Sequence, residues 1–316
     1  MDVLADVLAV SGVRGTLGAR IDAGSDWGWW AAPTPGAAFH AVTSGTAWLA
    51  RPGQPPQQLM PGDVLLLPGG AEHVLGSDPA AIARTGEHAS DDWEQAGTGV
   101  VRIGSGPVQT HILCAHYAYD PAMTTQLFAL LPDLVHIRAE NGGDGLQDTV
   151  RLLGRELARP QVATAVVLDR LVDILLVQLL RAWLQARPAE PEEPSWLGVL
   201  SDPVIGAAVA KLHEDPARGW TAAALAQEIS VSRATLSRRF PAVVGKAPGA
   251  YLTDWRMDLA ARRLRDTDDP LEAIARSVGY TSVYAFSRAF RRAREQPPGR
   301  YRVASRVGVG DDPARA

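Results

Sequence analysis

The C-terminal third of the chain contains an imperfect repeat, and this repeat restricts the possible fold more than any other feature of the sequence. The first copy is AALAQEISVSRATLSRRF (223–240) and the second is EAIARSVGYTSVYAFSRAF (272–290). Each copy has a Leu-Ala or Ile-Ala pair in its first part and two apolar residues, four positions apart, in its second part. A small alanine lets two helices cross closely, and residues four positions apart share one helix face. We therefore predict two helix-turn-helix units, at about residues 221–241 and 270–293.

The segment 247–267 between the two copies has the apolar pattern of one long helix, which would hold the units in a fixed relation. Two ordinary helical hairpins would give a similar pattern, but both copies also carry arginines on the face that the apolar residues leave free. Residues 197–305 contain 17 Lys and Arg against 11 Asp and Glu, whereas the rest of the chain has 14 basic and 24 acidic residues. This asymmetry indicates that only the C-terminal part meets a polyanion.

Three further segments, YLTDWRMDLAARRL (251–264), IARSVGYTSVYAFSRAFRRA (274–293) and PPGRYR (297–302), follow in this order. Together with the repeat, they resemble the AraC/XylS family of bacterial transcription regulators over about residues 197–303. The resemblance implies that the two units enter adjacent major-groove segments on one face of double-stranded DNA, about 34 Å apart.

The resemblance also implies which side chains face the DNA. These are Arg233, Ala234, Ser237 and Arg238 in the first unit, and Val283, Tyr284, Ser287, Arg288, Arg291 and Arg292 in the second. Arginine can bridge two acceptors of guanine, and we expect Arg291 and Arg292 to meet phosphates instead. The chain departs from the family pattern at Pro241, which could shorten or bend its helix, and at REQPP (294–298), where a glycine-containing turn is usual.

The N-terminal half is of a different kind, because residues 15–119 consist of short apolar runs separated by Gly, Pro and Asp turns. This pattern favours a β-barrel or sandwich. In PGDVLLLPGGAEH (61–73), the positions of Gly62, Pro68, Gly70 and His73 match the second motif of cupin barrels. The order of segments resembles the cupin-type sensor domain found in one branch of the AraC/XylS family.

A metal-dependent cupin enzyme would need a His-x-His pair and a carboxylate from its first motif, but that region offers only His40. His73, Cys114 and His116 could complete a set that suits zinc better than catalytic iron. In the alternative interpretation, His73 only closes a barrel end and Cys114 is a small buried apolar residue. An apolar pocket for an organic effector is equally open, with candidate lining residues Trp29, Phe39 and Trp48. No cofactor is certain, and zinc or another transition metal is the candidate.

Residues 121–187 are expected to form helices, the last of which has an apolar stripe. The stripe consists of Leu168, Leu171, Leu175, Leu179 and Trp183. It could pack on the outside of the barrel, form a dimer interface, or do both. The domains are therefore a sensor barrel (1–120), a helical extension for dimerisation (121–187), a Pro-rich acidic linker (188–195), a DNA-binding domain (196–305) and a tail (306–316).

The sequence thus predicts an α+β multidomain protein with an N-terminal cupin-like barrel and a C-terminal all-α domain. We interpret the chain as a sequence-specific DNA-binding transcription regulator, not an enzyme, whose barrel senses a small molecule, a metal or an oxidant. The alternative is a metal-dependent cupin enzyme fused to a DNA-binding module. The expected partners are promoter DNA, a second copy of the chain, an unknown effector and, for an activator, RNA polymerase. The single cysteine and the lack of a signal-peptide pattern or membrane span favour the cytoplasm.

Overall fold

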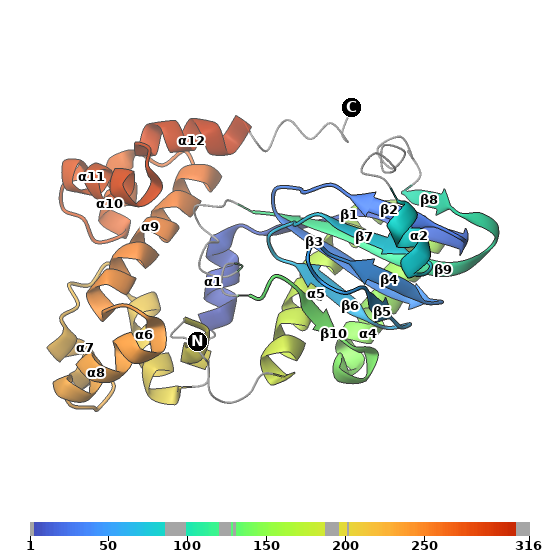
Figure 1. The fold of residues 1–316 in the computed structure, drawn as a ribbon. Coiled ribbons are helices and arrows are strands. Elements are labelled where there is room, and N and C mark those ends of the chain that lie inside the picture. The colour runs from blue at the N-terminus through green and yellow to red at the C-terminus, as the bar shows by residue number, and fades with distance from the viewer. Residues whose placement is uncertain are drawn as a thin grey trace. The chain divides into compact units, whose positions relative to one another are not determined.

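The computed structural model describes residues 3–85, 99–119, 128, 131–186, 196–200 and 202–307. The chain divides into two compact units, which are coloured by position along the sequence in Figure 1. The barrel unit comprises Val13–Tyr119 and Leu131–Arg187, and the C-terminal unit comprises Met1–Gly12, Asp120–Leu130 and Pro188–Ala316. The predicted linker 188–195 lies outside the described residues, as do residues 308–316 of the predicted tail and residues 121–127.

Two β-sheets form the barrel unit. The strands are β1 (Arg14–Ser25), β2 (Gly28–Ala31), β3 (Ala37–Ser44), β4 (Ala47–Ala50), β5 (Gln57–Leu59), β6 (Val64–Leu67), β7 (His73–Gly76), β8 (Val100–Ile103), β9 (Ser105–Ala118) and β10 (Val135–Ile137). One sheet has six strands in the order β10-β6-β3-β9-β1-β8, and the other has four in the order β2-β7-β4-β5. Apart from the parallel pair β1 and β8, all neighbouring strands are antiparallel.

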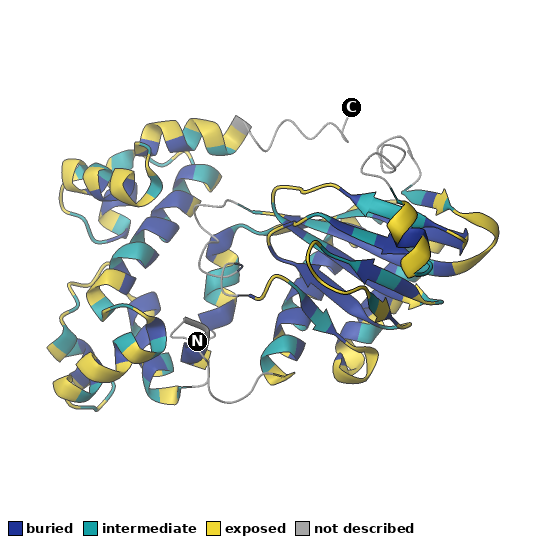
Figure 2. Ribbon diagram, in the orientation of Figure 1, coloured by how far each residue is buried: buried dark blue, intermediate teal, exposed yellow. Residues whose placement is uncertain are grey.

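The core of this unit lies between the two sheets, where alternate residues of the strands meet (Figure 2). Its buried side chains are Ile21, Ala23, Trp27, Val42, Ala47, Leu49, Leu59, Leu65, Leu75, Ile112 and Cys114. The motif noted in the sequence supplies the turn before β6, in which Gly62 has φ +91° and the carboxylate of Asp63 accepts from the backbone N–H of Met60 at 3.0 Å. It then supplies β6 and β7, so the cupin motif is built as the sequence predicts.

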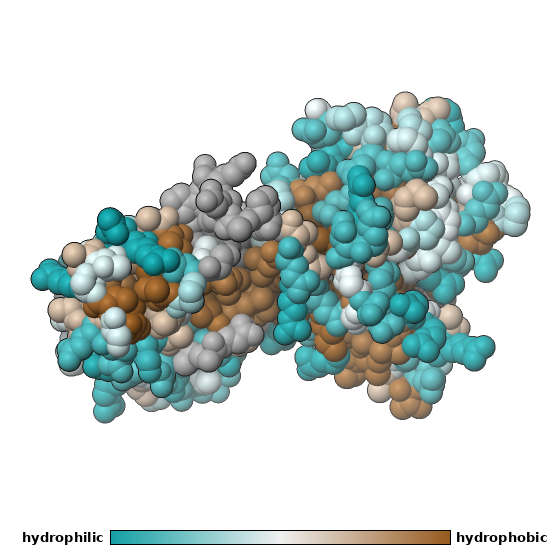
Figure 3. Space-filling view, turned by 90° about the horizontal axis from the view of Figure 1, so that it is seen from below, coloured by the Kyte–Doolittle hydropathy of each residue, from teal (hydrophilic) through white to brown (hydrophobic). Residues whose placement is uncertain are grey.

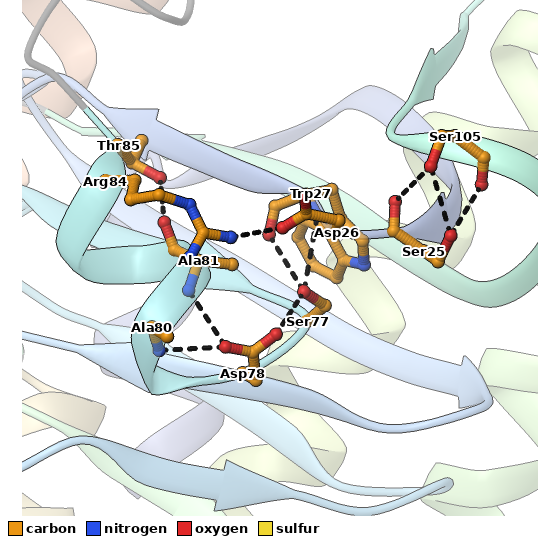
Figure 4. A network of polar contacts seen from close by, with 10 residues as sticks. All are labelled: Ser25, Asp26, Trp27, Ser77, Asp78, Ala80, Ala81, Arg84, Thr85 and Ser105. Carbon is orange, nitrogen blue, oxygen red and sulfur yellow. Dashed lines mark hydrogen bonds and ion pairs between the residues drawn. The ribbon is translucent and has the colours of Figure 1, made fainter.

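A short helix, α2 (Pro79–Arg84), follows β7 and is fixed by its first turn (Figure 4). The carboxylate of Asp78 accepts hydrogen bonds from the backbone N–H groups of Ala80 and Ala81, at 2.8 and 2.9 Å. Capping of this kind satisfies donors that a helix start leaves without partners. Ser77 joins the same network by donating to Asp78 at 2.9 Å.

Helices α4 (Gly143–Ala158) and α5 (Thr164–Ala186) pack on the outer face of the six-stranded sheet. Four members of the predicted stripe, Leu168, Leu171, Leu175 and Leu179, are buried there, and Trp183 is half-buried. The hydroxyl of Tyr117 on β9 donates to the carbonyl of Val172 on α5 at 2.8 Å. The stripe therefore packs against its own barrel, and any surface for a second copy lies on another face of these helices. Among the described residues, no helix is long and apolar enough to cross a membrane.

The C-terminal unit is helical. It contains α1 (Val3–Ser11), α6 (Pro203–Glu214), α7 (Ala222–Glu228), α8 (Arg233–Val244), α9 (Pro248–Asp266), α10 (Leu271–Ser277), α11 (Val283–Arg294) and α12 (Pro298–Val307). The pairs α7–α8 and α10–α11 are the two predicted helix-turn-helix units, joined by the long helix α9. The apolar residues of the repeat are buried, as expected: Leu225, Ala226, Leu236 and Phe240 in the first copy, and Ile274, Ala275, Phe286 and Phe290 in the second.

The two turns place different residues in the same left-handed backbone conformation. Gly279 in the second turn has φ +82°, and its counterpart in the first turn is Ser230, with φ +57°. Glycine adopts this left-handed conformation freely, whereas serine does so at a cost. Pro241 does not end its helix, because α8 continues to Val244. At the site of the missing glycine after α11, Glu295 itself takes the left-handed conformation, with φ +58°.

One element is in an unexpected place. The sequence assigns residues 1–120 to the barrel, but the described part of α1 packs with α6 and α9 in the C-terminal unit. The physical reason is that α1 is a nine-residue apolar helix whose buried residues Val3, Leu4 and Val10 find their partners there. The barrel proper therefore starts at β1, and Gly12, with φ +65°, lies between α1 and the start of the barrel unit at Val13.

Candidate nucleic-acid interface

Helix α8 presents one free face. Leu236 and Phe240 fix the opposite face in the core with no exposed area, and Ser232 starts the helix by accepting from the backbone N–H of Thr235 at 3.0 Å. On the free face, the four predicted residues are all exposed: Arg233, Ala234, Ser237 and Arg238. Arg239 differs from them, because its Nε donates to the carboxylate of Asp202 at 2.8 Å.

Helix α11 is built in the same way. Phe286 and Phe290 are fully buried, and Ser282 caps the helix start through the backbone N–H of Ala285 at 3.4 Å. On the free face, Tyr284 is 73% exposed, and the guanidinium carbon of Arg288 lies 5.8 Å from the centre of its ring. This stacking restricts the arginine side chain before any partner arrives.

The remaining predicted residues of α11 surround this pair. Val283 and Ser287 are half-buried beside it, whereas Arg291 and Arg292 are exposed on the last turns of the helix. Among the described residues, Arg291 and Arg292 have no ion-pair partner. Two arginines without carboxylate partners are available to an external anion, and they lie one helical turn beyond the residues that would face base edges.

Arg294, the last residue of α11, has a different role. Its guanidinium pairs with the carboxylate of Asp258 on α9, and the two side chains are only 7% and 10% exposed. Burial raises the pKa of Asp258 to about 7, although the charge of Arg294 opposes this change. The pair fixes the end of α11 to α9, which also packs against α8.

The barrel contains a buried polar cluster, which the sequence predicts in part. His40 on β3, His73 on β7 and Cys114 on β9 form a chain: Nε2 of His40 lies 2.8 Å from Nε2 of His73, and Nδ1 of His40 lies 3.2 Å from Sγ of Cys114. Nδ1 of His73 lies 2.9 Å from the carbonyl oxygen of Ala71. Trp29 packs edge-on against both histidines, with ring centroids 5.9 and 6.4 Å away.

Hydrogen-bonding rules fix the protons in this chain when both imidazoles are neutral. The carbonyl of Ala71 only accepts, so Nδ1 of His73 donates to it and Nε2 of His73 accepts from His40. Nδ1 of His40 is then left to accept from the thiol of Cys114. Burial lowers the pKa of both histidines and raises that of Cys114, which agrees with uncharged groups throughout. Sequence reasoning missed Ala71, because a backbone acceptor depends on loop geometry and not on residue type.

The structure does not assemble the other predicted barrel sites. Nε2 of His116 donates to the carbonyl of Pro35 at 2.6 Å and does not contact the cluster. Among the described residues, no group of three or more His, Cys, Asp or Glu side chains is arranged to hold a metal ion. The aromatic residues proposed for an effector pocket are not together either. Trp29 faces the histidines, whereas Phe39 packs edge-on against Tyr117 with ring centroids 6.3 Å apart, on the side of α5. Trp48 is half-buried between the core residues Ala47 and Leu49, so it points away from the core.

Comparisons with known proteins agree with the two-part architecture. Residues 2–185 match the family described as cupin, and residues 225–304 match the family described as helix-turn-helix domain. A putative AraC-like transcription regulator from Streptomyces lividans is 36% identical over 304 residues, which cover 96% of this chain and 98% of that protein. The HTH-type transcriptional regulator MtrA from Neisseria gonorrhoeae is 31% identical over 83% of this chain and 85% of its own length.

Among solved structures, the DNA-binding domain of AdpA, crystallised with a target DNA, is 31% identical and covers 35% of this chain and 98% of that chain, with a TM-score of 0.33. The cupin match covers the whole barrel unit up to residue 185, together with α1, and the helix-turn-helix match lies within the C-terminal unit; the identity to the Streptomyces lividans protein extends over both matches. The chain therefore belongs to the AraC-like DNA-binding transcription regulators, with a cupin domain at its N-terminus and a helix-turn-helix domain at its C-terminus.

Proposed function

We propose that α8 and α11 read two adjacent major-groove segments, with base contacts from the middle of each helix and phosphate contacts from the end of α11. The contact residues are Arg233, Ala234, Ser237, Arg238, Val283, Tyr284, Ser287, Arg288, Arg291 and Arg292. The observation that supports this proposal most strongly is the matching placement of the two free faces, each opposite a pair of buried anchors four residues apart. The second unit has a built-in asymmetry, because Arg288 is stacked on Tyr284 whereas Arg291 and Arg292 are not stacked or paired among the described residues.

The test is a duplex selected by the full chain from a random library, followed by binding measurements on all single base-pair substitutions. Replacing Arg288 by alanine removes discrimination at one or two base pairs and leaves the others as they were. Replacing Arg292 lowers affinity for every duplex by a similar factor and reduces the salt dependence. Equal losses on all sequences for the Arg288 variant would show that this residue contacts phosphate.

We further propose that the barrel senses a signal through the chain of Cys114, His40 and His73. This proposal is supported by the free energy that the arrangement costs. Two imidazoles and a thiol are buried beside an apolar core, where each of them needs a hydrogen-bond partner, whereas aliphatic side chains would pack there without one. The three kinds of signal are distinguishable. A metal would have to rearrange His40 to gather its donors, an oxidant would act on the thiol, and an organic effector would displace Trp29 from the histidines.

The experiment measures the DNA affinity of the full chain with and without added zinc, hydrogen peroxide or candidate organic effectors, together with the metal content of the purified protein. His40→Asn interrupts the chain and abolishes the response, whereas His116→Asn, which removes an imidazole outside the chain, keeps it. A response that survives His40→Asn, Cys114→Ala and His73→Asn places the sensing site elsewhere.

A second copy of the chain is the partner that we propose for the outer face of α5. Val166, Val167 and Ile174 are 60%, 39% and 45% exposed on this helix, although its other face is already buried against the barrel, and Leu152 of α4 is 41% exposed. Hydrophobic surface is visible on the barrel unit in Figure 3. An apolar face left uncovered is typical of a self-association site. Sedimentation should show a dimer, and Ile174→Asp should convert it to a monomer. Leu175→Ala is the control, because it weakens the packing of α5 on the barrel and leaves the outer face of the helix intact. An unchanged dimer after Ile174→Asp would exclude this face.

A further inference from the structure

Helix α1 precedes the barrel in sequence but is packed in the C-terminal unit. Val3, Leu4, Val10 and Ser11 are buried, and the helix contacts α6 and α9. The cupin match includes α1, because it covers residues 2–185, and the helix-turn-helix match begins only at residue 225. The family comparisons therefore group α1 with the barrel, whereas its packing groups it with the DNA-binding helices.

A hydrogen-bond chain connects α1 to these helices. The carboxylate of Asp6 on α1 lies 3.2 Å from Nδ1 of His213 on α6, and Nε2 of His213 lies 2.8 Å from the hydroxyl of Tyr251 on α9. A carboxylate only accepts, so Nδ1 of a neutral His213 donates to Asp6 and Nε2 accepts from Tyr251. Burial lowers the pKa of His213 to about 4 despite the nearby charge of Asp6, so the imidazole is neutral at pH 7. Three helices are thus joined by two hydrogen bonds with fixed directions.

Ring packing extends this connection to the first recognition helix. His213 is stacked on Trp255 of α9, with ring centroids 3.7 Å apart and an interplanar angle of 9°. Tyr251 lies edge-on to Phe240, with centroids 5.9 Å apart and an angle of 72°. Phe240 is the fully buried anchor of α8, and Arg238, two positions earlier, lies on the opposite, exposed face of the helix. A displacement of Tyr251 therefore changes the surface on which α8 packs, and with it the position of α8.

The burial of His213 makes Asp6 the sensitive end of the chain. The side chain of His213 is 1% exposed and that of Asp6 is 30% exposed. Without Asp6, a buried N–H loses its acceptor, and such a group costs free energy unless the surroundings move to satisfy it. The ring of His213 can reach another acceptor only by turning, and turning breaks the stack on Trp255 and the bond to Tyr251. Loss of one partly exposed carboxylate is thereby converted into a displacement of the Tyr251 side chain and of α8, which packs on it through Phe240.

We infer that α1 is a component of the DNA-binding unit and that Asp6 is a positioning residue for recognition helix α8, acting through His213 and Tyr251. DNA reading by this chain then depends on a residue more than 200 positions before the helix-turn-helix units in sequence. Helix α11 is held to α9 separately, by the pair of Asp258 and Arg294. Asp6 therefore affects the half of the DNA site that α8 reads and leaves the other half unaffected.

The test compares full-chain variants on a duplex that the wild-type chain has selected from a random library. Asp6→Ala removes the acceptor, Asp6→Asn keeps an oxygen that accepts from His213, and Asp144→Asn, on an exposed turn of the barrel unit, controls for the lost charge. We expect Asp6→Ala to weaken binding about tenfold, equivalent to about 1.4 kcal/mol. Penalties for base-pair substitutions should shrink in the α8 half of the duplex only, and hydrogen exchange should increase in α1, α6 and α8. Asp6→Asn restores most of the affinity, and Asp144→Asn behaves as wild type.

Tyr251→Phe provides an independent variant, because it removes the hydroxyl that donates to His213 and keeps the ring on Phe240. It should reproduce the loss in the α8 half. The inference is overturned if Asp6→Ala and Tyr251→Phe bind as wild type, if Asp6→Asn is as weak as Asp6→Ala, or if both halves of the duplex lose discrimination equally. An equal loss in both halves would indicate general destabilisation of the unit and not positioning of α8.

Discussion

Replacing Arg294 by methionine should destabilise the C-terminal unit strongly, because it leaves the carboxylate of Asp258 buried without its counter-charge. Both side chains are nearly inaccessible, at 7% and 10% exposure, so solvent cannot compensate. Breaking a buried pair by removing one partner typically costs about 3–5 kcal/mol, whereas replacing both partners is often close to neutral. We therefore expect a loss of about 3–5 kcal/mol for Arg294→Met at pH 8 and a recovery of most of this loss in Asp258→Asn/Arg294→Met.

The pH dependence provides a second check on the same reasoning. Burial raises the pKa of Asp258 from 3.8 to about 7 while Arg294 is present, and removal of Arg294 raises it further. The folded state then binds a proton more tightly than the unfolded state, so the stability lost at pH 8 returns as the pH falls. The expected slope approaches about 1.4 kcal/mol per pH unit between the unfolded and folded pKa values.

Urea titrations of the full chain at pH 8 and pH 5.5, followed by far-ultraviolet circular dichroism, measure both effects. Arg292→Met is the matched control, because this exposed neighbour has no ion-pair partner among the described residues and its removal should change stability by less than about 0.5 kcal/mol. The reasoning is refuted if Arg294→Met stays within about 1 kcal/mol of wild type at pH 8, or if the double variant is as unstable as the single one.

Three further predictions concern DNA reading, backbone strain and acid sensitivity. Arg288→Ala should weaken binding to the selected duplex by about 1–3 kcal/mol and leave non-specific binding nearly unchanged, as a titration on a scrambled duplex would reveal. Glu295→Gly should raise the thermal midpoint of the C-terminal unit, because a left-handed non-glycine residue costs about 1 kcal/mol; a lower midpoint would contradict the assigned conformation. Burial lowers the pKa of His213 from 6.5 in the unfolded chain to about 4 in the folded chain. The stability that depends on neutral His213 is therefore complete above pH 6.5 and is lost as the pH falls toward 4. Unfolding of His213→Gln should therefore depend less on pH over that range.

The helix-turn-helix units were predictable because their information is local. Leu236 and Phe240, like Phe286 and Phe290, are one helical turn apart, and this spacing alone determines which face is buried and which is free. The free faces of both copies carry arginines, and the resemblance to the AraC/XylS family implied which side chains on them face DNA. Pro241 does not shorten its helix, since α8 continues past it to Val244.

The barrel site was predictable only in part, because it depends on strand register. Alternation places Cys114 and His116 on one side of β9, but pairing of His40 with Cys114 requires β3 and β9 to align across 74 residues. Of these two residues of β9, Cys114 lies within hydrogen-bond distance of His40, whereas Nε2 of His116 donates to the carbonyl of Pro35. Helix α1 had no usable signal, since a nine-residue, mostly apolar helix fits many surfaces and His213, the partner of its Asp6, lies 207 positions away.

The position of α1 has a practical consequence for cutting the protein into parts. Because the chain enters the barrel from α1 and leaves it toward α6, the DNA-binding unit is held to the barrel by covalent connections on both sides. A single protease cut between residues 187 and 195 should therefore not release the C-terminal helices, since α1 remains attached to the barrel and bound to α6 and α9. We expect the cut protein to behave as a complementing pair of fragments, and the C-terminal fragment expressed alone to lack Asp6, the acceptor for Nδ1 of His213.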